Sequence, residues 1–330
     1  MKVVVTGGAG HVGAIVSGRL FAAGMNVTVL DRLVYGGESL LGFWGSPGFR
    51  LVHGDVRQPD TLRDAMRGAD AVVHLAAIVG EPACSIDEDE AWSVNYGGTE
   101  AALAIARECN IRRFIFISTC SNYGVSDPGQ IADENSPLHP LSQYARSKVE
   151  AENHVLKYAG DVCALVLRLG TMCGLSPRMR FDLLVSDMAR AAVLGDPISV
   201  FSPEAWRPFL HIRDAGRAVA HCLLQPEGKV RGKVFNVVGE NYQKKGLADL
   251  VLKHYPDTRI AITEKKTDPR DYRVSGEAIR HALQFNPEST VEDAFLEAAS
   301  AIAAGVFREP RWPGHSAIPL AVSHAQGGQP

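Results

Sequence analysis

The chain has 330 residues, of which 46% are hydrophobic and 22% charged, a composition typical of a globular protein with one large or two modest domains. Its 34 Lys and Arg residues against 37 Asp and Glu residues give a formal net charge of -3, and without a long basic run this argues against a nucleic-acid partner. No apolar stretch reaches the roughly 18–20 residues of a bilayer span, and the first apolar run is too short for a secretory signal, so we expect no membrane partner and a cytoplasmic location.

Apolar strands alternate with helical patterns from the first residues onward. The predicted strands are Lys2–Thr6, Asn26–Leu30, Arg50–Val52, Ala71–Leu75, Phe114–Ser118 and Val162–Leu167. The predicted helices between them are His11–Ala23, Asp60–Met66, Ala91–Glu108 and Leu141–Tyr158. Strands that are apolar throughout are typical of a parallel sheet with helices on both faces. The alternation therefore predicts an α/β fold of the Rossmann type, with a doubly wound parallel sheet.

Beyond Arg168 the alternation becomes less regular. Further elements are predicted as a helix at Phe181–Leu194, a strand and a helix within Arg207–Leu224, and a strand at Lys233–Val238. We expect the last two segments to return to the main sheet, which makes the second domain discontinuous in sequence. The predicted Rossmann domain comprises residues 1–168 plus about 208–238, and the smaller α/β substrate domain about 169–207 plus 239–307. The tail, 308–330, is rich in Pro and Gly and is expected to be poorly ordered or laid over the surface.

The cysteines and histidines show no metal-binding spacing. The cysteines are scattered as Cys84, Cys109, Cys120, Cys163, Cys173 and Cys222, without a Cys-x-x-Cys pair. This pattern favours reduced thiols that pack as small hydrophobic side chains. The histidines are equally dispersed, so we expect no metal site.

A glycine-rich turn joins the first predicted strand to the first predicted helix. Gly7, Gly10 and Gly13 give the pattern G-x-x-G-x-x-G, in which Cβ atoms would block the approach of a pyrophosphate to the backbone. Asp31 ends the second strand about 20 residues later, where a carboxylate binds the adenosine ribose and repels a 2′-phosphate. The sequence therefore predicts a dinucleotide site that favours NAD, although the guanidinium of Arg32 leaves NADP open.

A second pattern lies on the predicted helix that contains Tyr144 and Lys148. Residues four apart share one helix face, so the phenol and the ammonium are expected side by side. A nearby ammonium and an oxidised nicotinamide would both favour the phenolate, which makes Tyr144 a candidate base. Lys148 could also hold the nicotinamide ribose. The hydroxyl of Thr119 follows a strand at the edge where doubly wound folds bind their ligands.

These motifs, in this order, resemble the extended short-chain dehydrogenase/reductases, the sugar-nucleotide epimerases and dehydratases, over about residues 1–305. The resemblance implies that Thr119 hydrogen-bonds the reacting sugar oxygen, that Tyr144 is the base and that Lys148 activates it. It also implies contacts to the cofactor: Asp55 at the adenine, Val56 by backbone contact and Leu75-Ala76-Ala77 at the phosphates, with Asn95 supporting the active-site helix. The cofactor set is thus Gly7, Gly10, His11, Val12, Gly13, Asp31, Arg32, Asp55, Val56, Leu75, Ala76, Ala77, Asn95, Tyr144 and Lys148.

The substrate side departs from the family pattern. Family dehydratases carry Asp-Glu directly after the catalytic threonine, whereas this chain has Cys120-Ser121, which disfavours dehydration. Many epimerases have an Asn where this chain has Thr171. The candidate substrate residues are Gly80, Glu81, Ser121, Asn122, Thr171, Arg178, Arg207 and Arg270, of which Arg207 and Arg270 match positions that contact nucleotide phosphate in relatives. Glu81 is equally well read as a solvated loop carboxylate, and Arg178 and Arg180 as surface charges.

The preferred interpretation is an NAD-dependent epimerase of a nucleotide-diphosphate sugar, with inversion at C4 through a transient keto-sugar. One alternative is an NAD(P)H-dependent reductase of a 4-keto-sugar nucleotide, which would use the same residues. A remote alternative is a non-catalytic regulator that senses NAD(H). Because relatives pack two long helices per subunit into a four-helix bundle, the resemblance also implies a homodimer formed by Ala91–Glu108 and Leu141–Tyr158.

Overall fold

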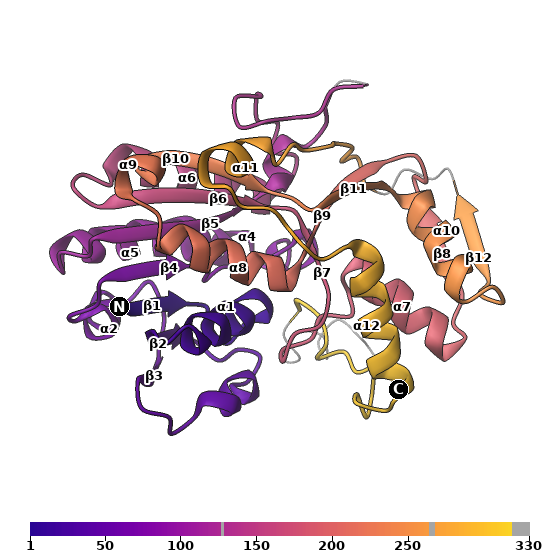
Figure 1. The fold of residues 1–330 in the computed structure, drawn as a ribbon, viewed down its shortest axis with the longest axis horizontal. Coiled ribbons are helices and arrows are strands. Elements are labelled where there is room, and N and C mark those ends of the chain that lie inside the picture. Colours follow the sequence, from indigo (N-terminus) through magenta and orange to yellow (C-terminus); the bar gives the residue numbers. More distant parts are fainter. Residues whose placement is uncertain (127–128, 264–267, 319–330) are drawn as a thin grey trace.

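A computed structural model of the chain describes residues 1–126, 129–263 and 268–318. Its centre is a seven-stranded parallel sheet in the order β10-β6-β5-β4-β1-β2-β3 (Figure 1). The strands are β1 Lys2–Thr6, β2 Asn26–Asp31, β3 Phe49–His53, β4 Ala71–His74, β5 Arg113–Thr119, β6 Cys163–Leu169 and β10 Lys233–Val237. The order reverses between β1 and β4, and this is where open α/β sheets bind their ligands.

Helices cover both faces of this sheet, and each face has its own apolar core. One core includes α1 His11–Ala22, α8 Ile212–Leu223 and α11 Glu277–Leu283, and the other includes α2 Pro59–Met66, α5 Gly98–Glu108 and α6 Gln143–Tyr158. Shorter helices connect them: η1 Glu38–Phe43, α3 Glu81–Cys84, α4 Glu88–Trp92, η2 Ser93–Gly97, η3 Cys120–Tyr123 and α9 Glu227–Val230. The predicted Rossmann-type architecture is confirmed.

The six strands predicted in the first half are all confirmed, with ends that differ by at most two residues. The predicted helix Ala91–Glu108 is a continuous succession of α4, the π turn η2 and α5. Helix α6 starts two residues later than expected because the side chain of Ser142 caps it, accepting a hydrogen bond from the Ala145 amide at 3.1 Å.

A smaller unit lies beside the main sheet, at the right in Figure 1. Its helices pack on a third core. Its elements are β7 Thr171–Cys173, α7 Leu184–Leu194, β8 Ile198–Phe201, β9 Trp206–His211, β11 Glu240–Gln243, α10 Lys244–His254, β12 Ile260–Thr263 and α12 Val291–Ala303. They form a three-stranded sheet, β11-β9-β7, and the pair β12-β8.

One expectation about the second half was wrong. We expected the strand within Arg207–Leu224 to return to the main sheet, but β9 pairs with β7 and β11 instead. The reason is that β10 occupies the edge of β6 in parallel register, which leaves no free edge there. The rest of the expectation is confirmed, since β10 joins the sheet and α8 packs on α1.

The described part of the tail, Arg308–Ile318, packs against both halves of the molecule. The His315 ring lies 5.2 Å from that of Phe181, measured between centroids. The Tyr35 hydroxyl, from the loop after β2, donates to the carbonyl of Ala317. This segment is therefore laid over the surface, while the expectation for residues 319–330 lies outside the described residues.

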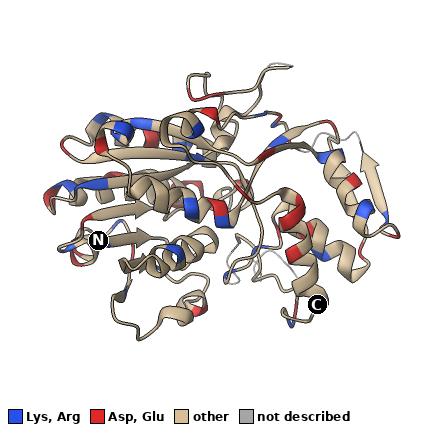
Figure 2. Cartoon of the chain, in the orientation of Figure 1, with Lys and Arg blue, Asp and Glu red and all other residues tan. Residues whose placement is uncertain are grey.

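Basic and acidic residues are mixed along the ribbon in both units (Figure 2). Among the described residues, the structure contains no helix of the length and apolarity that a bilayer crossing requires.

Candidate functional site

The glycine turn after β1, Gly7–Gly13, is shaped so that side chains are excluded from it. Gly7 has a φ of +72°, and a Cβ there would lie 2.8 Å from the Ala76 amide nitrogen. A Cβ on Gly13 would lie 2.0 Å from the Gly7 carbonyl oxygen. Any other residue would therefore push α1 away from β1.

The start of α1 offers free backbone donors to an anion. Gly10 occupies the N-cap position, no side chain caps the helix, and no acidic residue lies in its first turn. The first N–H groups of a helix lack intrahelical partners, and the helix dipole places partial positive charge there. This arrangement fits the pyrophosphate of a dinucleotide, with His11, Val12 and Gly13 forming the first turn.

His11 lies buried beside this turn. Its Nδ1 is 2.9 Å from the Arg178 carbonyl oxygen, so Nδ1 carries the hydrogen and donates it. Burial lowers the pKa of His11 to about 3, which keeps the ring neutral. Its Nε2 has no hydrogen-bond partner among the described residues. A buried acceptor left open next to the turn is consistent with a ligand hydroxyl there.

The end of β4 lies directly against the glycine turn. The Leu75 amide donates to the Thr6 carbonyl at 3.1 Å, and the Ala76 amide donates to Thr6 Oγ1 at 3.3 Å. Leu75, Ala76 and Ala77 are half-buried, so they border the space above the turn. Their position at the reversal of strand order matches the predicted phosphate side of the cofactor.

Asp31 ends β2 with its carboxylate fixed by two backbone amides. Ala9 N donates to Oδ2 at 2.9 Å and Leu33 N donates to Oδ1 at 2.8 Å. Burial raises the pKa of Asp31 above its ordinary value, although these two bonds oppose the shift. The carboxylate is thereby held beside the glycine turn, as a contact to the adenosine ribose requires.

Arg32, Asp55 and Val56 lie at the same end of the sheet. Asp55 is engaged by Arg57, whose Nη2 lies 2.6 Å from Oδ2, and Arg32 Nε lies 3.5 Å from the same oxygen. Val56 is buried and packs against the glycine face of α5. The carboxylate predicted to face the adenine therefore also lies next to two arginines.

Asn95 supports the active-site helix, as the resemblance implied. Its Nδ2 donates to Ser147 Oγ on α6 at 3.2 Å and to the Ile78 carbonyl at 3.0 Å. Its Oδ1 accepts from the Ile78 amide at 2.8 Å. The Asn95 side chain is buried and thus ties the loop after β4 to α6; its role as a direct cofactor contact stays a prediction.

Thr119 and Tyr144 meet between the end of β5 and the first turn of α6. The Thr119 hydroxyl acts to lower the pKa of Tyr144, which favours the phenolate. Burial nevertheless dominates and raises the pKa of Tyr144 above its ordinary value, with the charge of Arg180 acting in the opposite direction. The lowering of this pKa that the sequence suggested does not occur in the protein without ligands. The reason is that burial of the phenol raises the pKa more than Arg180 and Thr119 lower it.

Lys148 lies one turn further along α6 and is buried. Its Nζ donates to the Ile117 carbonyl at 2.9 Å and lies 4.7 Å from the centroid of the Phe116 ring. Burial lowers the pKa of Lys148 to about 8, while the charge of Glu152 acts to raise it. The side chain is an ammonium at neutral pH, held against the strand that ends in Thr119.

A buried polar network that the sequence reasoning missed lies beneath these residues. Glu152 of α6 pairs with Arg168 of β6 at 2.7 Å and accepts hydrogen bonds from Ser118 and Asn122. Arg168 also donates to the Tyr123 hydroxyl at 2.9 Å. The sequence contains one indication of this network, because Glu152 lies four residues after Lys148 and therefore on the same face of the helix. The network fixes α6 to the end of β5.

The substrate side is formed by the loop after β4 and by the residues after β5. Gly80, with a φ of +88°, precedes α3, and Glu81 is the exposed first residue of that helix. The Tyr272 hydroxyl donates to Ser121 Oγ at 3.3 Å. Burial raises the pKa of both Cys84 and Tyr272, so both groups are uncharged next to this site at neutral pH. Cys84 belongs to the segment after the fourth strand that was expected to line the substrate pocket, whereas Tyr272 was not predicted because it belongs to no recognisable pattern.

Arg207, Arg270 and Thr171 lie further along this side. Both arginines bind Asp268: Arg207 Nη2 at 2.8 Å, and Arg270 through Nε at 2.9 Å and Nη2 at 2.7 Å. Asp268 therefore places two guanidiniums together, and their charges hold its own pKa far below the ordinary range. Thr171 is half-buried at the start of β7, opposite Phe209.

Two predicted substrate residues need correction. The Asn122 side chain is fully buried and its Nδ2 donates to Glu152 at 2.7 Å, so it supports the loop and does not face a ligand. The Arg178 guanidinium donates to the Ser316 carbonyl and stacks on the Tyr35 ring, 4.0 Å from its centroid. Arg178 is thus bound to the C-terminal segment. Its assignment as a substrate residue failed because the sequence does not indicate where that segment packs.

Comparison with known proteins agrees with this geometry. The family model described as "NAD dependent epimerase/dehydratase family" matches residues 3–238. A dTDP-glucose 4,6-dehydratase from Streptomyces niveus is 30% identical over 325 residues, which cover 90% of this chain and 91% of the relative. A UDP-glucose 4-epimerase from Streptomyces lividans is 36% identical over 160 residues, which cover 47% of this chain and 46% of the relative.

A solved structure gives the same fold over almost the whole chain. DesIV, a dTDP-glucose 4,6-dehydratase from Streptomyces venezuelae with NAD and TYD bound, has a TM-score of 0.82 and 25% sequence identity. The match covers 96% of this chain and 100% of that one. The described residues contain no group of three or more His, Cys, Asp or Glu side chains that could hold a metal ion.

Proposed function

The chain belongs to the NAD-dependent epimerase/dehydratase family, with NAD as its cofactor, and on this premise we propose that it is an epimerase that inverts C4 of a nucleotide-linked sugar through a transient keto-sugar. The observation that carries the proposal is the packing of α6, which carries Tyr144 and Lys148, against β5, which ends in Thr119, with Cys120-Ser121 in the two positions that follow Thr119. The first three residues serve oxidation and reduction of an alcohol. The last two provide no acid for dehydration.

Each residue has a defined task in this proposal. NAD, when bound, supplies a site that accepts and returns hydride. Tyr144 as phenolate takes the proton of the sugar 4-hydroxyl and later returns it. Thr119 hydrogen-bonds the same oxygen and holds it next to the phenol. Lys148, positively charged next to the strand end, favours the phenolate and holds the nicotinamide ribose.

Dehydration is disfavoured by the chemistry of positions 120 and 121. The Cys120 thiol is buried, it contacts the Arg168 carbonyl at 3.4 Å, and burial raises its pKa. The Ser121 hydroxyl accepts a hydrogen bond from Tyr272. Neither group is a carboxylic acid, so neither is suited to protonate a departing sugar hydroxyl.

The experiment is product analysis with purified protein, NAD and a panel of UDP-, dTDP-, GDP- and CDP-hexoses. We expect one nucleotide sugar to be converted to its C4 epimer without net change in NADH absorbance. Accumulation of a 4-keto-6-deoxy sugar would identify a dehydratase instead. Stoichiometric NADH oxidation on a keto-sugar would identify a reductase, and tight NAD(H) binding without turnover of any sugar would favour the regulator.

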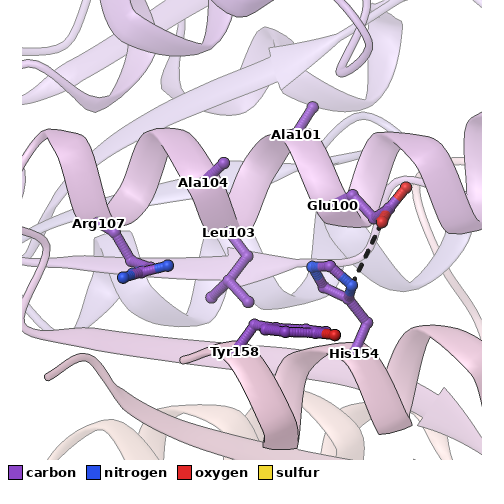
Figure 3. A pocket seen from close by; sticks show the side chains of 7 residues that line it. All are labelled: Glu100, Ala101, Leu103, Ala104, Arg107, His154 and Tyr158. Carbon is purple, nitrogen blue, oxygen red and sulfur yellow. Dashed lines mark ion pairs between the residues drawn. The ribbon is translucent and has the colours of Figure 1, made fainter. Parts of the chain in front are cut away.

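The same proposal includes a homodimer formed through α5 and α6. These helices flank a groove of about 440 Å³ on the surface, shown in Figure 3, lined by Glu100, Ala101, Leu103, Ala104, Arg107, His154 and Tyr158. Leu156 and Tyr158 on α6 are exposed large apolar side chains, as is Trp92 on α4. Apolar surface of this kind on two adjacent long helices supports packing against a second copy.

Light scattering at micromolar concentration tests the dimer. We expect twice the chain mass for the wild type and a shift toward the monomer for Ala104→Arg, which places a charge in the groove. Lys229→Arg, on α9 away from the groove, is the control. A monomeric wild type would contradict the dimer without affecting the catalytic proposal, and the cytoplasmic location stays a prediction.

A further inference from the structure

From the sequence, the presence of Arg32 left the choice between NAD and NADP open. The structure shows which side chains contact Arg32 and the neighbouring Arg57. Arg32 follows Asp31 directly, at the end of β2, and Arg57 lies just after Asp55 at the end of the neighbouring strand β3. These guanidiniums therefore flank the carboxylate proposed to bind the adenosine ribose. In other dinucleotide-binding folds, an arginine in this place accommodates a 2′-phosphate.

Both arginines are already paired with carboxylates. Arg57 binds Asp55 at 2.6 Å and Glu90 at 2.5 Å and 3.1 Å. Arg32 binds Glu90 at 2.9 Å and lies 3.5 Å from Asp55. We call Arg32, Asp55, Arg57 and Glu90 the ion cluster. It contains two positive and two negative groups, so its guanidiniums carry no surplus charge for a phosphate.

Glu90 differs from the other members because it comes from another part of the chain. It lies on α4, 58 residues from Arg32 and 33 from Arg57, and among the described residues it is the one carboxylate that is hydrogen-bonded to both guanidiniums. Its position is fixed locally, since its own amide donates to the N-cap Asp87 at 2.8 Å. Asp55, by contrast, accepts from the Arg57 backbone as well as its side chain.

We propose that Glu90 is a specificity-determining residue for the cofactor, which excludes NADP by occupying Arg32 and Arg57. The proposal rests on the dinucleotide site described above. Asp31 repels the 2′-phosphate, and Glu90 withholds the two cations that would otherwise compensate this repulsion. Glu90 is about one-third exposed, so its removal leaves the core intact.

The test is the dissociation constant for NAD and for NADP, measured by calorimetry at low salt. Glu90→Gln removes the charge and keeps the shape, and Glu90→Ala removes the partner altogether. We expect the affinity for NADP to rise about tenfold in both variants, the scale of one charge-assisted hydrogen bond, and the affinity for NAD to stay within about twofold. Asp89→Asn, which makes the same change in net charge on the exposed face of α4, should leave both constants unchanged.

Each outcome separates this inference from the proposed site. If the wild type binds no NAD, the dinucleotide site itself is wrong. If NAD binds but both Glu90 variants discriminate against NADP as strongly as the wild type does, the inference is overturned. Loss of NAD binding in both variants at an unchanged unfolding midpoint would also overturn it, because Glu90 would then support the site and not select its ligand. An equal gain in Asp89→Asn would do so too, since net charge alone would explain it.

Discussion

At the scale of single residues, the candidate site depends on side chains whose ionisation is set by burial. Burial raises the pKa of Tyr144 and lowers that of Lys148 to about 8, so both shifts oppose the charged pair that catalysis needs. The Thr119 hydroxyl, acting on Tyr144, and the carboxylate of Glu152, acting on Lys148, shift the two pKa values in the other direction. The phenolate therefore has to be stabilised further when cofactor and substrate are bound.

Replacement of Tyr144 by Phe removes the proposed base and keeps the ring. We expect kcat to fall about 10²- to 10⁴-fold, the usual contribution of a positioned acid or base, with little change in the unfolding midpoint. Tyr255→Phe, just after α10 in the smaller unit, keeps its ring contact with Phe295 and is the matched control for steady-state kinetics. Equal kcat values in the wild type and Tyr144→Phe would rule out the assigned role.

The pH dependence of the free energy of unfolding tests the lowered pKa values of two buried histidines, His11 and His74. Burial lowers the pKa of both His11 and His74 to about 3. Between pH 6.5 and 3 the unfolded chain binds a proton at each residue and the folded chain does not. The free energy of unfolding should therefore decrease as the pH falls below 6.5, by up to about 1.4 kcal/mol per pH unit for each residue.

Urea unfolding between pH 7.5 and 5.5 measures this slope before most carboxylates titrate. His74→Gln should reduce the slope, because His74 lies between Thr6 and Thr99 without an acidic partner. His281→Gln is the control, since that side chain is exposed on α11. The same slope in His74→Gln and the wild type would contradict the assignment.

At the scale of elements, helix α6 is attached to the sheet by charge as well as by apolar packing. The Glu152–Arg168 pair joins α6 to β6, and through Ser118 it reaches the residue before Thr119. This attachment sets the relation between the strand that carries Thr119 and the helix that carries Tyr144. An error of about 1 Å in such a relation can cost a factor of about 100 in rate.

Glu152→Gln would leave the Arg168 charge buried without compensation. We expect a loss of about 3–5 kcal/mol in the free energy of unfolding, whereas the double variant Glu152→Met with Arg168→Met should lose less, because no unpaired charge remains. Chemical denaturation of Glu152→Met, Arg168→Met and the double variant gives the coupling energy. Additive losses would show that the pair is not coupled.

At the scale of the whole molecule, the C-terminal segment connects the two units. It receives hydrogen bonds from Tyr35 of the Rossmann unit and from Arg178, and Arg178 in turn accepts one from His11 next to the glycine turn. The segment therefore links the loop after β2 to Arg178 and, through Arg178, to the start of α1.

Arg178→Met and Arg207→Lys separate a structural arginine from a substrate-binding one. The first should lower the free energy of unfolding by about 1–3 kcal/mol through two unsatisfied carbonyls, with little change in KM for the nucleotide sugar. The second should raise KM, because Lys cannot present the bidentate fork that a phosphate accepts. It should also lower the free energy of unfolding, because the Arg207 guanidinium is buried and donates to Asp268 and to two backbone carbonyls. A raised KM in Arg178→Met together with an unchanged KM in Arg207→Lys would restore Arg178 as a substrate contact.

The local elements of the Rossmann unit could be predicted because their causes are local. Apolar strands, the helical spacing of Tyr144 and Lys148, and the glycine pattern each depend on a few adjacent residues. The path of β9 could not be predicted, because it depends on which strand occupies the edge of β6. Asn122 was misassigned for a similar reason, since its partner Glu152 lies 30 residues away.

The amino-acid sequence by itself determined the parallel sheet, the turn that only glycine permits and the order of motifs that marks the family. The tertiary structure alone decided which charges meet: Glu90 with Arg32 over 58 residues, Glu152 with Arg168 over 16, and Arg178 with the Ser316 carbonyl over 138. The physical reason is the distance in sequence over which each feature is determined. Backbone conformation depends on residues that are neighbours in the chain, whereas an ion pair or a buried hydrogen bond depends on which surfaces pack together.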